Sequence, residues 1–322
     1  MNKLIIIDGN AILHRAFHAL PPLTNSKGEY TNAIYGFVSI LFKVIEDLKP
    51  THLAVTFDRK KPTFRKKMYR DYQAKRPEMD VNLVPQISKV HQVLESMKVS
   101  IYERDGFEAD DVIATLAKQA LEKRKNKTSD ECEIDQIIIV TGDRDLLQLV
   151  NENVKLFMPV KGLSEGKIFG EQETIERMGV KPDLIPDFKA LAGDNSDNYP
   201  GVAGIGPKTA VTLIKQFGTI DSIYKNLDKI ENDNIKLKLI KDKKNAMMSH
   251  KLATVVDNVA IKFDLKKSQA HDLATQEAIK LFGDLGFKTH LKRLLNMGKV
   301  RTNDDTIKPG TKKDSEKQME LF

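Results

Sequence analysis

The chain has 322 residues, of which 40% are hydrophobic and 30% charged, so it can form one large or two smaller packed domains and is too apolar to be disordered throughout. No run reaches the roughly 20 consecutive apolar residues of a membrane helix, and a single cysteine excludes a disulfide framework or a thiolate metal cage, so we expect a cytoplasmic protein. The formal net charge of +7 permits binding to nucleic acid without proving it.

The first half of the chain alternates between short apolar runs and amphipathic segments. Ile, Val and Leu between turn residues predict buried parallel strands at residues 4–7, 53–57 and 137–141. Apolar residues at helical spacing predict helices at 33–48, 84–97 and 112–121, and the polar run 123–135 is typical of a surface loop. The alternation predicts an α/β layer around a parallel sheet.

Strand signals fade after about residue 182. Helices are predicted at 186–191, 208–217, 236–256 and 275–295. From about residue 299 the chain is polar and has no apolar period, which indicates a flexible tail. We therefore expect three parts: an α/β part at 1–182 that includes a basic segment at about 59–80, a helical part at 183–298, and a tail at 299–322.

The excess positive charge is concentrated in one segment, residues 59–76, which holds nine Lys or Arg and a single acid, Asp71. A solvated helical face is one interpretation of such a run. However, Phe64, Tyr69 and Tyr72 are interleaved with the cations, and single-stranded nucleic acid favours this combination because cations bind phosphates and rings stack on bases.

Acidic residues follow all three predicted strands. Asp8 follows the first, Asp58 the second, and Asp143 and Asp145 the third, so we expect them to meet at the carboxyl edge of the sheet. Two further clusters could reach that edge, and they contain Glu108, Asp110, Asp111, Asp194 and Asp197. Helix capping could explain any one of these acids.

Together, nine carboxylates without cations would repel one another, so bound Mg²⁺ or Mn²⁺ ions are the simpler explanation. Zinc is disfavoured because no histidine has zinc-site spacing. Two ions suit in-line displacement at phosphorus, which predicts phosphodiester hydrolysis.

A glycine-rich turn precedes the predicted helix at 208–217. Gly201 and Gly206 have the spacing of a nucleotide-binding phosphate loop, but Pro207 interrupts the motif and no strand precedes it. A hairpin between two helices, or a purely structural turn, fits better. In the hairpin interpretation a phosphate would lie at the N-terminus of the helix that begins near Pro207. The residues expected to contact it are Gly201, Gly204, Gly206, Lys208 and Thr209.

These motifs, taken together, resemble the 5′ nuclease family of flap endonucleases and 5′ to 3′ exonucleases, most closely the N-terminal nuclease domain of bacterial DNA polymerase I. The similar stretches span roughly residues 1 to 295 in family order, at 7–10, 15–17, 31–37, 57–58, 108–111, 141–145 and 193–198. The resemblance implies a PIN-like α/β nuclease core at 1–182 with a helical arch in the basic segment. It also implies a helix-three-turn-helix DNA-binding region at 183–298.

The resemblance also implies roles for individual residues. One metal site would use mostly Asp8, Asp58, Glu108 and Asp110, and the second site or the shell between them would use Asp111, Asp143, Asp145, Asp194 and Asp197. Tyr72, Gln73, Lys75 and Arg76 would act in the arch, through which a 5′ single strand passes. DNA contacts would come from Arg15, Arg65, Lys66, Lys67 and the hairpin, which would hold the duplex backbone with a K⁺ ion on its carbonyls.

One departure from the family pattern concerns the arch, where Gln73 stands in the place of a lysine that reaches the scissile phosphate. Glutamine cannot neutralise a phosphate, so the sequence predicts slower turnover or a substitute cation from Lys75, Lys66 or Lys67. The alternative function is a DNA-structure-binding relative with little catalysis. A PIN-type ribonuclease is disfavoured by the duplex-holding hairpin.

A second departure is length, because no polymerase domain follows; the sequence therefore predicts a free-standing, monomeric nuclease. The tail ends in Gln318, Leu321 and Phe322, which resemble the peptide that docks bacterial proteins on the DNA sliding clamp. The predicted function is a metal-dependent, structure-specific 5′ to 3′ exonuclease or flap endonuclease of replication and repair. Its substrates would be branched or nicked DNA and RNA-DNA 5′ ends.

Overall fold

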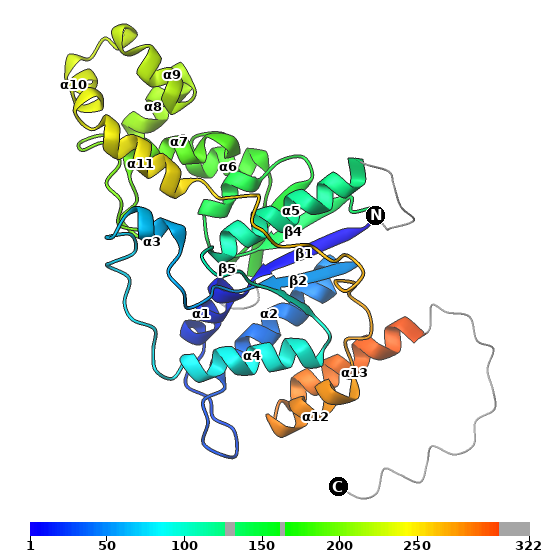
Figure 1. Cartoon of the computed structure of the whole chain (residues 1–322). Coiled ribbons are helices and arrows are strands. Elements are labelled where there is room, and N and C mark those ends of the chain that lie inside the picture. Colours follow the sequence, from blue (N-terminus) through cyan, green and yellow to red (C-terminus); the bar gives the residue numbers. More distant parts are fainter. Residues whose placement is uncertain (126–132, 162–164, 303–322) are drawn as a thin grey trace, which may run out of the picture.

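A computed structural model describes residues 1–125, 133–161 and 165–302 (Figure 1). In this part of the chain the strands form one six-stranded sheet in the order β3-β2-β1-β4-β5-β6. The strands are β1 (Lys3–Asp8), β2 (His52–Thr56), β3 (Ser100–Tyr102), β4 (Gln136–Val140), β5 (Val154–Lys161) and β6 (Glu165–Phe169). All neighbours are parallel except β5 and β6. The mainly parallel sheet and its three predicted strands are confirmed.

The helices of the first half alternate with the strands. They are α1 (Gly9–Ala19), α2 (Asn32–Leu48), α3 (Phe64–Met68), α4 (Val84–Ser96), α5 (Ala109–Lys125) and α6 (Glu171–Met178). The second half contains α7 (Ile185–Ala192), α8 (Pro207–Phe217), α9 (Ile220–Lys225), α10 (Asp233–Lys241), α11 (Lys243–Ala253), α12 (Gln276–Asp284) and α13 (Lys288–Thr302). Short 3₁₀ turns lie at η1 (Asp145–Leu149), η2 (Pro182–Leu184) and η3 (Leu227–Lys229). None of these helices is long and apolar enough to cross a membrane.

Two helices that the sequence predicts as continuous are each broken in two. Asp242 separates α10 from α11, and its carboxylate accepts hydrogen bonds from the backbone N–H of Ala203 and the side chain of Asn245. Gly286, with a φ of 73°, separates α12 from α13 in the left-handed region that favours glycine. Apolar periodicity runs through both breaks, so it could not locate them.

The two faces of the sheet are covered by different helices. Leu4 and Ile6 of β1 pack in one cluster with α5 and the helices that follow it, whereas Ile5 and Ile7 pack in a second cluster with α1, α2 and α4. The α12–α13 pair belongs to the second cluster, where the Phe282 ring stacks on Phe42 at a centroid distance of 5.8 Å. Figure 1 shows α8 to α10 standing away from the sheet, while α12 and α13 lie beside α2. We therefore place α12 and α13 with the sheet and not with the projecting helices.

The basic segment is less helical than the implied arch. Between β2 and α4 the described chain forms only the five-residue α3 and a series of turns through residues 70–76. Gln73 has a φ of 55°, a left-handed conformation that a continuous helix does not allow. The arch is therefore a short helix followed by an irregular strap.

His290 makes the stability of the native state depend on pH. The ring is 1% exposed, its Nε2 lies 2.8 Å from Ser39 Oγ, and its Nδ1 has no hydrogen-bond partner among the described residues. Burial, with the charge of Arg293, lowers the pKa of His290 to about 4. The native state thus favours the neutral ring, and this stability is present above the unfolded pKa of about 6.5 and is lost as the pH falls towards about 4.

We expect His290→Phe to flatten the pH dependence of the free energy of unfolding in this window. Lowering the pH from 7 to 5 should cost the wild type about 2 kcal/mol more than the variant. Urea unfolding at the two pH values measures the difference, and His271→Gln, at an exposed histidine, should behave as the wild type. Parallel curves for wild type and His290→Phe would contradict this assignment.

Candidate active site

The acids that follow the strands lie at the carboxyl edge of the sheet, as the sequence predicts. Asp8 is the last residue of β1, and it caps α1 by accepting a hydrogen bond from the backbone N–H of Ala11 at 3.0 Å. Its other carboxylate oxygen accepts from Thr141 Oγ1 at 2.8 Å, immediately after β4. Asp58, after β2, accepts from the backbone N–H of Ala109 at 2.7 Å, which brings the start of α5 to the same edge.

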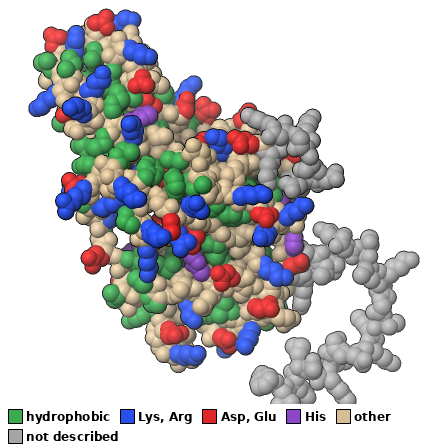
Figure 2. All heavy atoms as spheres, viewed as in Figure 1, with side chains coloured by type: hydrophobic (Ala, Val, Ile, Leu, Met, Phe, Trp, Pro, Cys, Tyr) green, Lys and Arg blue, Asp and Glu red, His purple; other side chains and the backbone are tan. Residues whose placement is uncertain are grey.

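These acids surround a cavity of about 840 Å³. Seven of the nine predicted carboxylates line it: Asp8, Asp58, Glu108, Asp110, Asp143, Asp145 and Asp197. The basic side chains that line it are Arg59, Arg65 and Arg76, together with His14 and His18. Figure 2 shows acidic side chains gathered beside basic ones near the centre of the face in view. The cavity therefore combines many carboxylates with a few cations.

Burial and the charges of neighbouring acids both oppose ionisation of the carboxylates inside the cavity. Burial, with the charges of Asp58 and Asp143, raises the pKa of Asp8 to about 7. Burial also raises the pKa of Glu108 to about 7 and, with the charge of Asp143, raises the pKa of Asp110 well above its ordinary value. Such a group of buried acids would be stabilised by added positive charge.

A second group of acids already has a protein cation. Lys189 on α7 is buried, and its Nζ donates to Asp145 and, at 2.5 Å, to Asp194. Burial opposes ionisation of Asp194, but Lys189 outweighs it and lowers the pKa of Asp194 to about 2. Burial raises the pKa of Asp145 to about 7 in spite of Lys189. Asp194 is thus held by Lys189, and it does not line the cavity.

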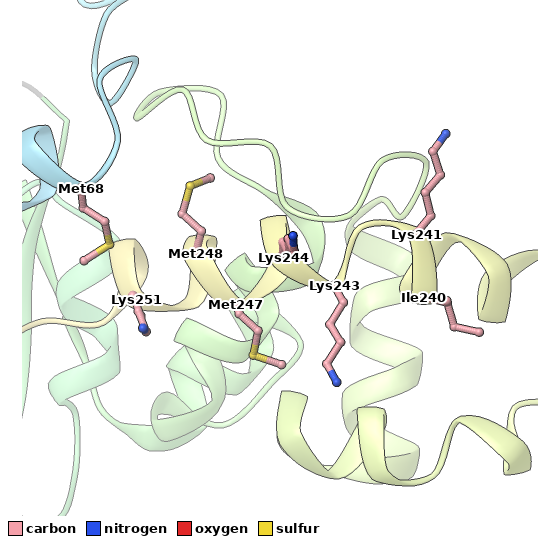
Figure 3. Close-up of a pocket in the computed structure, with 8 residues that line it drawn as sticks. All are labelled: Met68, Ile240, Lys241, Lys243, Lys244, Met247, Met248 and Lys251. Atoms are coloured by element: carbon pink, nitrogen blue, oxygen red, sulfur yellow. The ribbon is translucent and has the colours of Figure 1, made fainter.

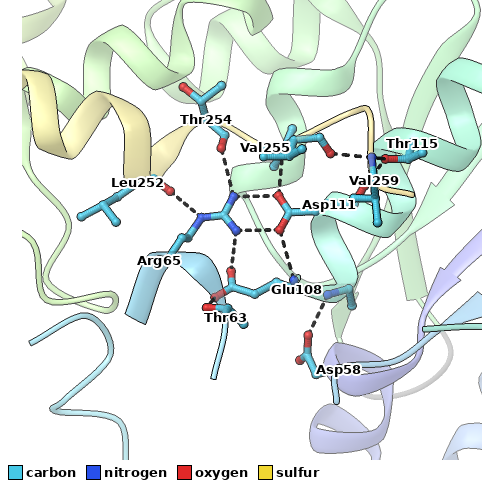
Figure 4. Close-up of polar contacts among 12 residues, drawn as sticks. Asp58, Thr63, Arg65, Glu108, Asp111, Thr115, Leu252, Thr254, Val255 and Val259 are labelled. Carbon is cyan, nitrogen blue, oxygen red and sulfur yellow. Dashed lines mark hydrogen bonds and ion pairs between the residues drawn. The ribbon is translucent and has the colours of Figure 1, made fainter. Parts of the chain in front are cut away.

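Asp111 and Arg65 have different positions from those the sequence predicts (Figure 4). Both oxygens of Asp111 accept from the Arg65 guanidinium, at 2.7 and 2.8 Å, and they also accept from the backbone N–H groups of Glu108 and Val256. Asp111 is fully buried and does not line the cavity, so all its acceptor capacity in this arrangement serves the protein. The structure thus places it outside the predicted ligand set.

The Arg65 guanidinium, expected to contact DNA, is 2% exposed. All five of its N–H groups are used, because it also donates to Glu108 at 3.2 Å and to the backbone carbonyls of Leu252 and Thr254. This leaves no donor for a phosphate, so the expected DNA contact is not compatible with the structure. Arg65 instead joins α3, the start of α5 and the end of α11.

Three of the predicted arch residues converge on Asp197. Its carboxylate accepts from Arg76 at 2.6 Å, from the Tyr72 hydroxyl at 3.1 Å and from the Gln73 side chain at 3.3 Å. The Tyr72 hydroxyl oxygen also lies 3.2 Å from Glu108 Oε2, so its single proton can go to either carboxylate and the residue links the arch to the acids of α5. The lysines proposed as substitutes for the missing cation are elsewhere: Lys66 donates to the Tyr72 carbonyl, and Lys67 and Lys75 are exposed outside the cavity lining.

The glycine hairpin forms between α7 and α8, away from the cavity lining. Gly201 has a φ of 61°, and a Cβ there would lie 2.3 Å from the backbone nitrogen of Gly193, so the turn requires glycine at this position. Helix α8 begins at Pro207 after Gly206, which leaves its first N–H groups open, and Lys208 is exposed beside them. The predicted contacts Gly204 and Thr209 lie in the same turn and first helical turn. Arg15 lies on α1, apart from this hairpin.

Three residues of the site were not predicted from the sequence. Thr141 fixes Asp8, Asn10 accepts from the backbone N–H of Asp58 at 3.0 Å, and Lys189 holds two acids. Asn10 and Thr141 each lie two positions from a predicted acid in the sequence, Asp8 and Asp143 respectively. Lys189 could have been suspected from its place on the helix that ends just before Asp194.

The carboxylates are not drawn together into a tight cluster. In residues 1–125, 133–161 and 165–302, no three His, Cys, Asp or Glu side chains are arranged closely enough to hold a metal ion. Several of the acids are instead engaged by protein cations: Lys189 bridges Asp145 and Asp194, Arg65 bridges Glu108 and Asp111, and Arg76 pairs with Asp197.

Two family models cover most of the chain. The 5′-3′ exonuclease N-terminal resolvase-like domain matches residues 3–179, and the 5′-3′ exonuclease C-terminal SAM fold matches residues 180–276. The chain is 38% identical over 269 residues to a 5′-3′ exonuclease of Aquifex aeolicus, which covers 83% of this chain and 87% of that protein. It is also 38% identical over 292 residues to DNA polymerase I of Bacillus subtilis, which covers 91% of this chain but 32% of the polymerase. The chain thus spans about a third of the length of the DNA polymerase I relatives.

Solved structures share the fold. A bacteriophage T5 flap endonuclease, in a complex with DNA and metal ions, superposes with a TM-score of 0.63 at 18% identity and covers 92% of this chain and 100% of its own. The catalytic core of Rad2 in complex with a DNA substrate gives a TM-score of 0.59 at 16% identity and covers 92% of both chains. At these identities the likeness concerns the fold alone.

Proposed function

Because this chain belongs to the 5′-3′ exonuclease family, we propose that it hydrolyses phosphodiester bonds at 5′ ends and 5′ flaps of DNA in a metal-dependent reaction. The observation that carries the proposal is a cavity that seven of the nine predicted carboxylates line, with Arg76 and Tyr72 at its wall. A protein that only bound DNA would have no use for so many buried acids facing a polyanion, because they repel it. Replication and repair are the processes in which such ends arise.

The donor chemistry of the cavity suits divalent ions, although its carboxylates would have to approach one another to share one. Asp8, Asp58, Glu108, Asp110 and Asp143 offer hard oxygen donors. Burial and the charges of neighbouring acids raise the pKa values of the first four, so a bound cation would stabilise their ionised forms. Asp145 and Asp197, which line the cavity, would serve a second ion, and Asp194 would join them only after exchanging its contact with Lys189. Beside them the buried Tyr199 hydroxyl has no hydrogen-bond partner among the described residues, so it can bond a water of a hydrated ion. Bound Mg²⁺ or Mn²⁺ ions would activate water and offset the negative charge that develops on the phosphate.

The side chains of the chain itself would position the substrate. Arg76 is half-exposed and reaches the cavity from the arch, so it can pair with the phosphate next to the scissile bond after exchanging its contact with Asp197. The open N–H groups at the start of α8, with Lys208, would hold a duplex phosphate away from the cavity, and the hairpin carbonyls would hold a K⁺ ion. The distance between these two contacts would define where a junction is cut.

Cleavage of a 5′-labelled flap duplex tests the proposal. We expect cutting near the junction with Mg²⁺ or Mn²⁺ and none with a chelator. The absence of metal-dependent cleavage, with binding intact, would favour the alternative of a DNA-structure-binding relative. Gln73→Lys measures what the missing arch lysine costs: because Gln73 lines the cavity, a lysine there should increase the rate about 10-fold or more by adding a cation near the phosphate. An unchanged rate would mean that Arg76 suffices.

We also propose that the C-terminal residues Gln318, Leu321 and Phe322 bind the sliding clamp; they lie outside the described residues. Their support is the sequence pattern, in which apolar anchors end a polar stretch. Deleting residues 318–322 should abolish co-elution with a purified bacterial clamp and leave flap cleavage without the clamp unchanged. Co-elution of the truncated protein would contradict the proposal.

A further inference from the structure

An open groove of about 810 Å³ lies between the arch and the projecting helices (Figure 3). It shares no lining residue with the cavity of the candidate active site. We call it the lysine-methionine groove. It is lined by Met68 of α3 and by Ile240, Lys241, Lys243, Lys244, Met247, Met248 and Lys251 of α10 and α11. Figure 3 shows lysines and methionines following one another along α11, with Met68 near the end where Lys251 lies. None of these residues has a role in the cavity described above.

All the charged residues that line the groove are lysines. Four lysines line it and no acid does, and among the described residues these lysines form no ion pair. Lys243 instead lies over the Tyr224 ring, with its Nζ 5.3 Å from the centroid. Four exposed ammonium groups along one short surface repel one another and attract a polyanion.

The groove is also unusually apolar for a surface. Met68 is 45% exposed and Ile240 is 52% exposed, and Met247 and Met248 are half-buried between the lysines. Figure 2 shows hydrophobic side chains beside basic ones on the projecting part of the molecule that carries α10 and α11. Methionine is flexible and polarisable, so it adapts to flat apolar surfaces of varied shape.

The positive charge and the exposed apolar side chains of the groove together indicate which ligand it binds. A duplex presents phosphates and sugars outward and keeps its base faces stacked inside, so it would match the lysines but not the methionines. A single strand offers phosphates and unstacked bases together. The groove also continues from α3, whose Lys66 and Lys67 are exposed, and α3 belongs to the basic segment at the cavity.

We infer that the lysine-methionine groove binds the single-stranded 5′ segment of the substrate after it has passed the arch. The inference rests on the proposed function, because it assigns part of that substrate to a second surface. In it, Lys243, Lys244 and Lys251 contact phosphates, and Met68 and Met248 contact bases.

Binding is measured with a chelator present, so that nothing is cut, by the fluorescence anisotropy of a duplex with a long 5′ overhang and of the same duplex with blunt ends. The test variant combines Lys243→Gln, Lys244→Gln and Lys251→Gln. The matched control combines Lys280→Gln, Lys288→Gln and Lys292→Gln, which remove the same charge from exposed positions on α12 and α13.

The test variant should bind the overhang duplex about 10-fold more weakly, and its slope of log affinity against log salt should fall by about 2, as three lost single-strand phosphate contacts imply. Blunt-duplex binding and the control variant should match the wild type. Equal weakening on both DNAs would overturn the inference in favour of duplex binding, and unchanged overhang binding would overturn it outright.

A second comparison addresses the methionines. An overhang of normal nucleotides should bind the wild type more tightly than an abasic overhang of equal length, and Met68→Ser should reduce that preference. A preference that Met68→Ser leaves intact would remove Met68 from the site. Failure of the proposed function is distinguishable, since it appears as wild-type protein that does not cut a flap with Mg²⁺ or Mn²⁺, whatever the groove binds.

Discussion

Asp143→Asn should reduce flap cleavage by at least about 10³-fold, because it removes a charge that the proposed ions need and metal stabilisation of the reacting phosphate is worth several kcal/mol. The substitution preserves the local fold. Asp143 Oδ1 accepts from the backbone N–H of Asp145 at 2.8 Å, and the asparagine oxygen can accept the same bond. Single-turnover cleavage of the labelled flap, at saturating protein, measures the loss without a contribution from binding.

Without metal, the same substitution should stabilise the protein. The charge of Asp143 contributes to the raised pKa values of Asp8, Asp110 and Asp145. Removing this charge therefore reduces the repulsion that each of these three carboxylates experiences. The melting temperature of the metal-free variant should rise by about 2 to 4 °C for each kcal/mol relieved. Its further rise with millimolar Mg²⁺ or Mn²⁺ should be smaller than that of the wild type.

Asp284→Asn is the control, because Asp284 is an exposed acid on α12. It should change neither the rate nor either melting temperature. A wild-type melting temperature that responds to neither ion would contradict the convergence of the acids on ions. Loss of cleavage in Asp143→Asn together with a lower metal-free melting temperature would instead indicate a damaged fold.

The sequence predicts most of the sheet and much of the site because both depend on local patterns. Strands with apolar runs are buried on both faces, and acids that follow parallel strands must meet at one edge, so Asp8, Asp58 and Asp143 could be placed before the fold was known. The short edge strand β3 and the strands β5 and β6 carry weaker patterns and were not predicted.

The charge of a residue alone could not show which acids face the cavity and which have a structural role. Asp110 and Asp111 are adjacent and chemically identical, yet one lines the cavity and the other lies beneath it, because successive helical residues point about 100° apart. Likewise, Arg65 lies in a run of exposed cations but turns into the protein. Its partners Leu252 and Thr254 are far away in sequence, so no local pattern could predict its burial.

Arg65→Met should lower the free energy of unfolding by about 3 to 5 kcal/mol, which is the typical cost of removing one partner of a buried ion pair. The change leaves Asp111 as a buried, unpaired carboxylate and leaves the carbonyls of Leu252 and Thr254 without a donor. Glu108 would also lose a bond, so the arch, the start of α5 and the end of α11 would no longer be joined. Urea unfolding measures the change.

Arg293→Met provides a matched comparison, because Arg293 also forms two hydrogen bonds to one carboxylate, that of Glu46, at 3.0 and 2.8 Å. This pair is on the surface, so its loss should cost less than about 1 kcal/mol. Combining Arg65→Met with Asp111→Leu should cost less than the sum of the two single changes, because the second change removes the stranded charge. If Arg65→Met instead costs no more than Arg293→Met, the Arg65 cluster does not hold the three elements together, and the arch must be fixed by its other contacts, such as those of Tyr72 and Arg76 with Asp197.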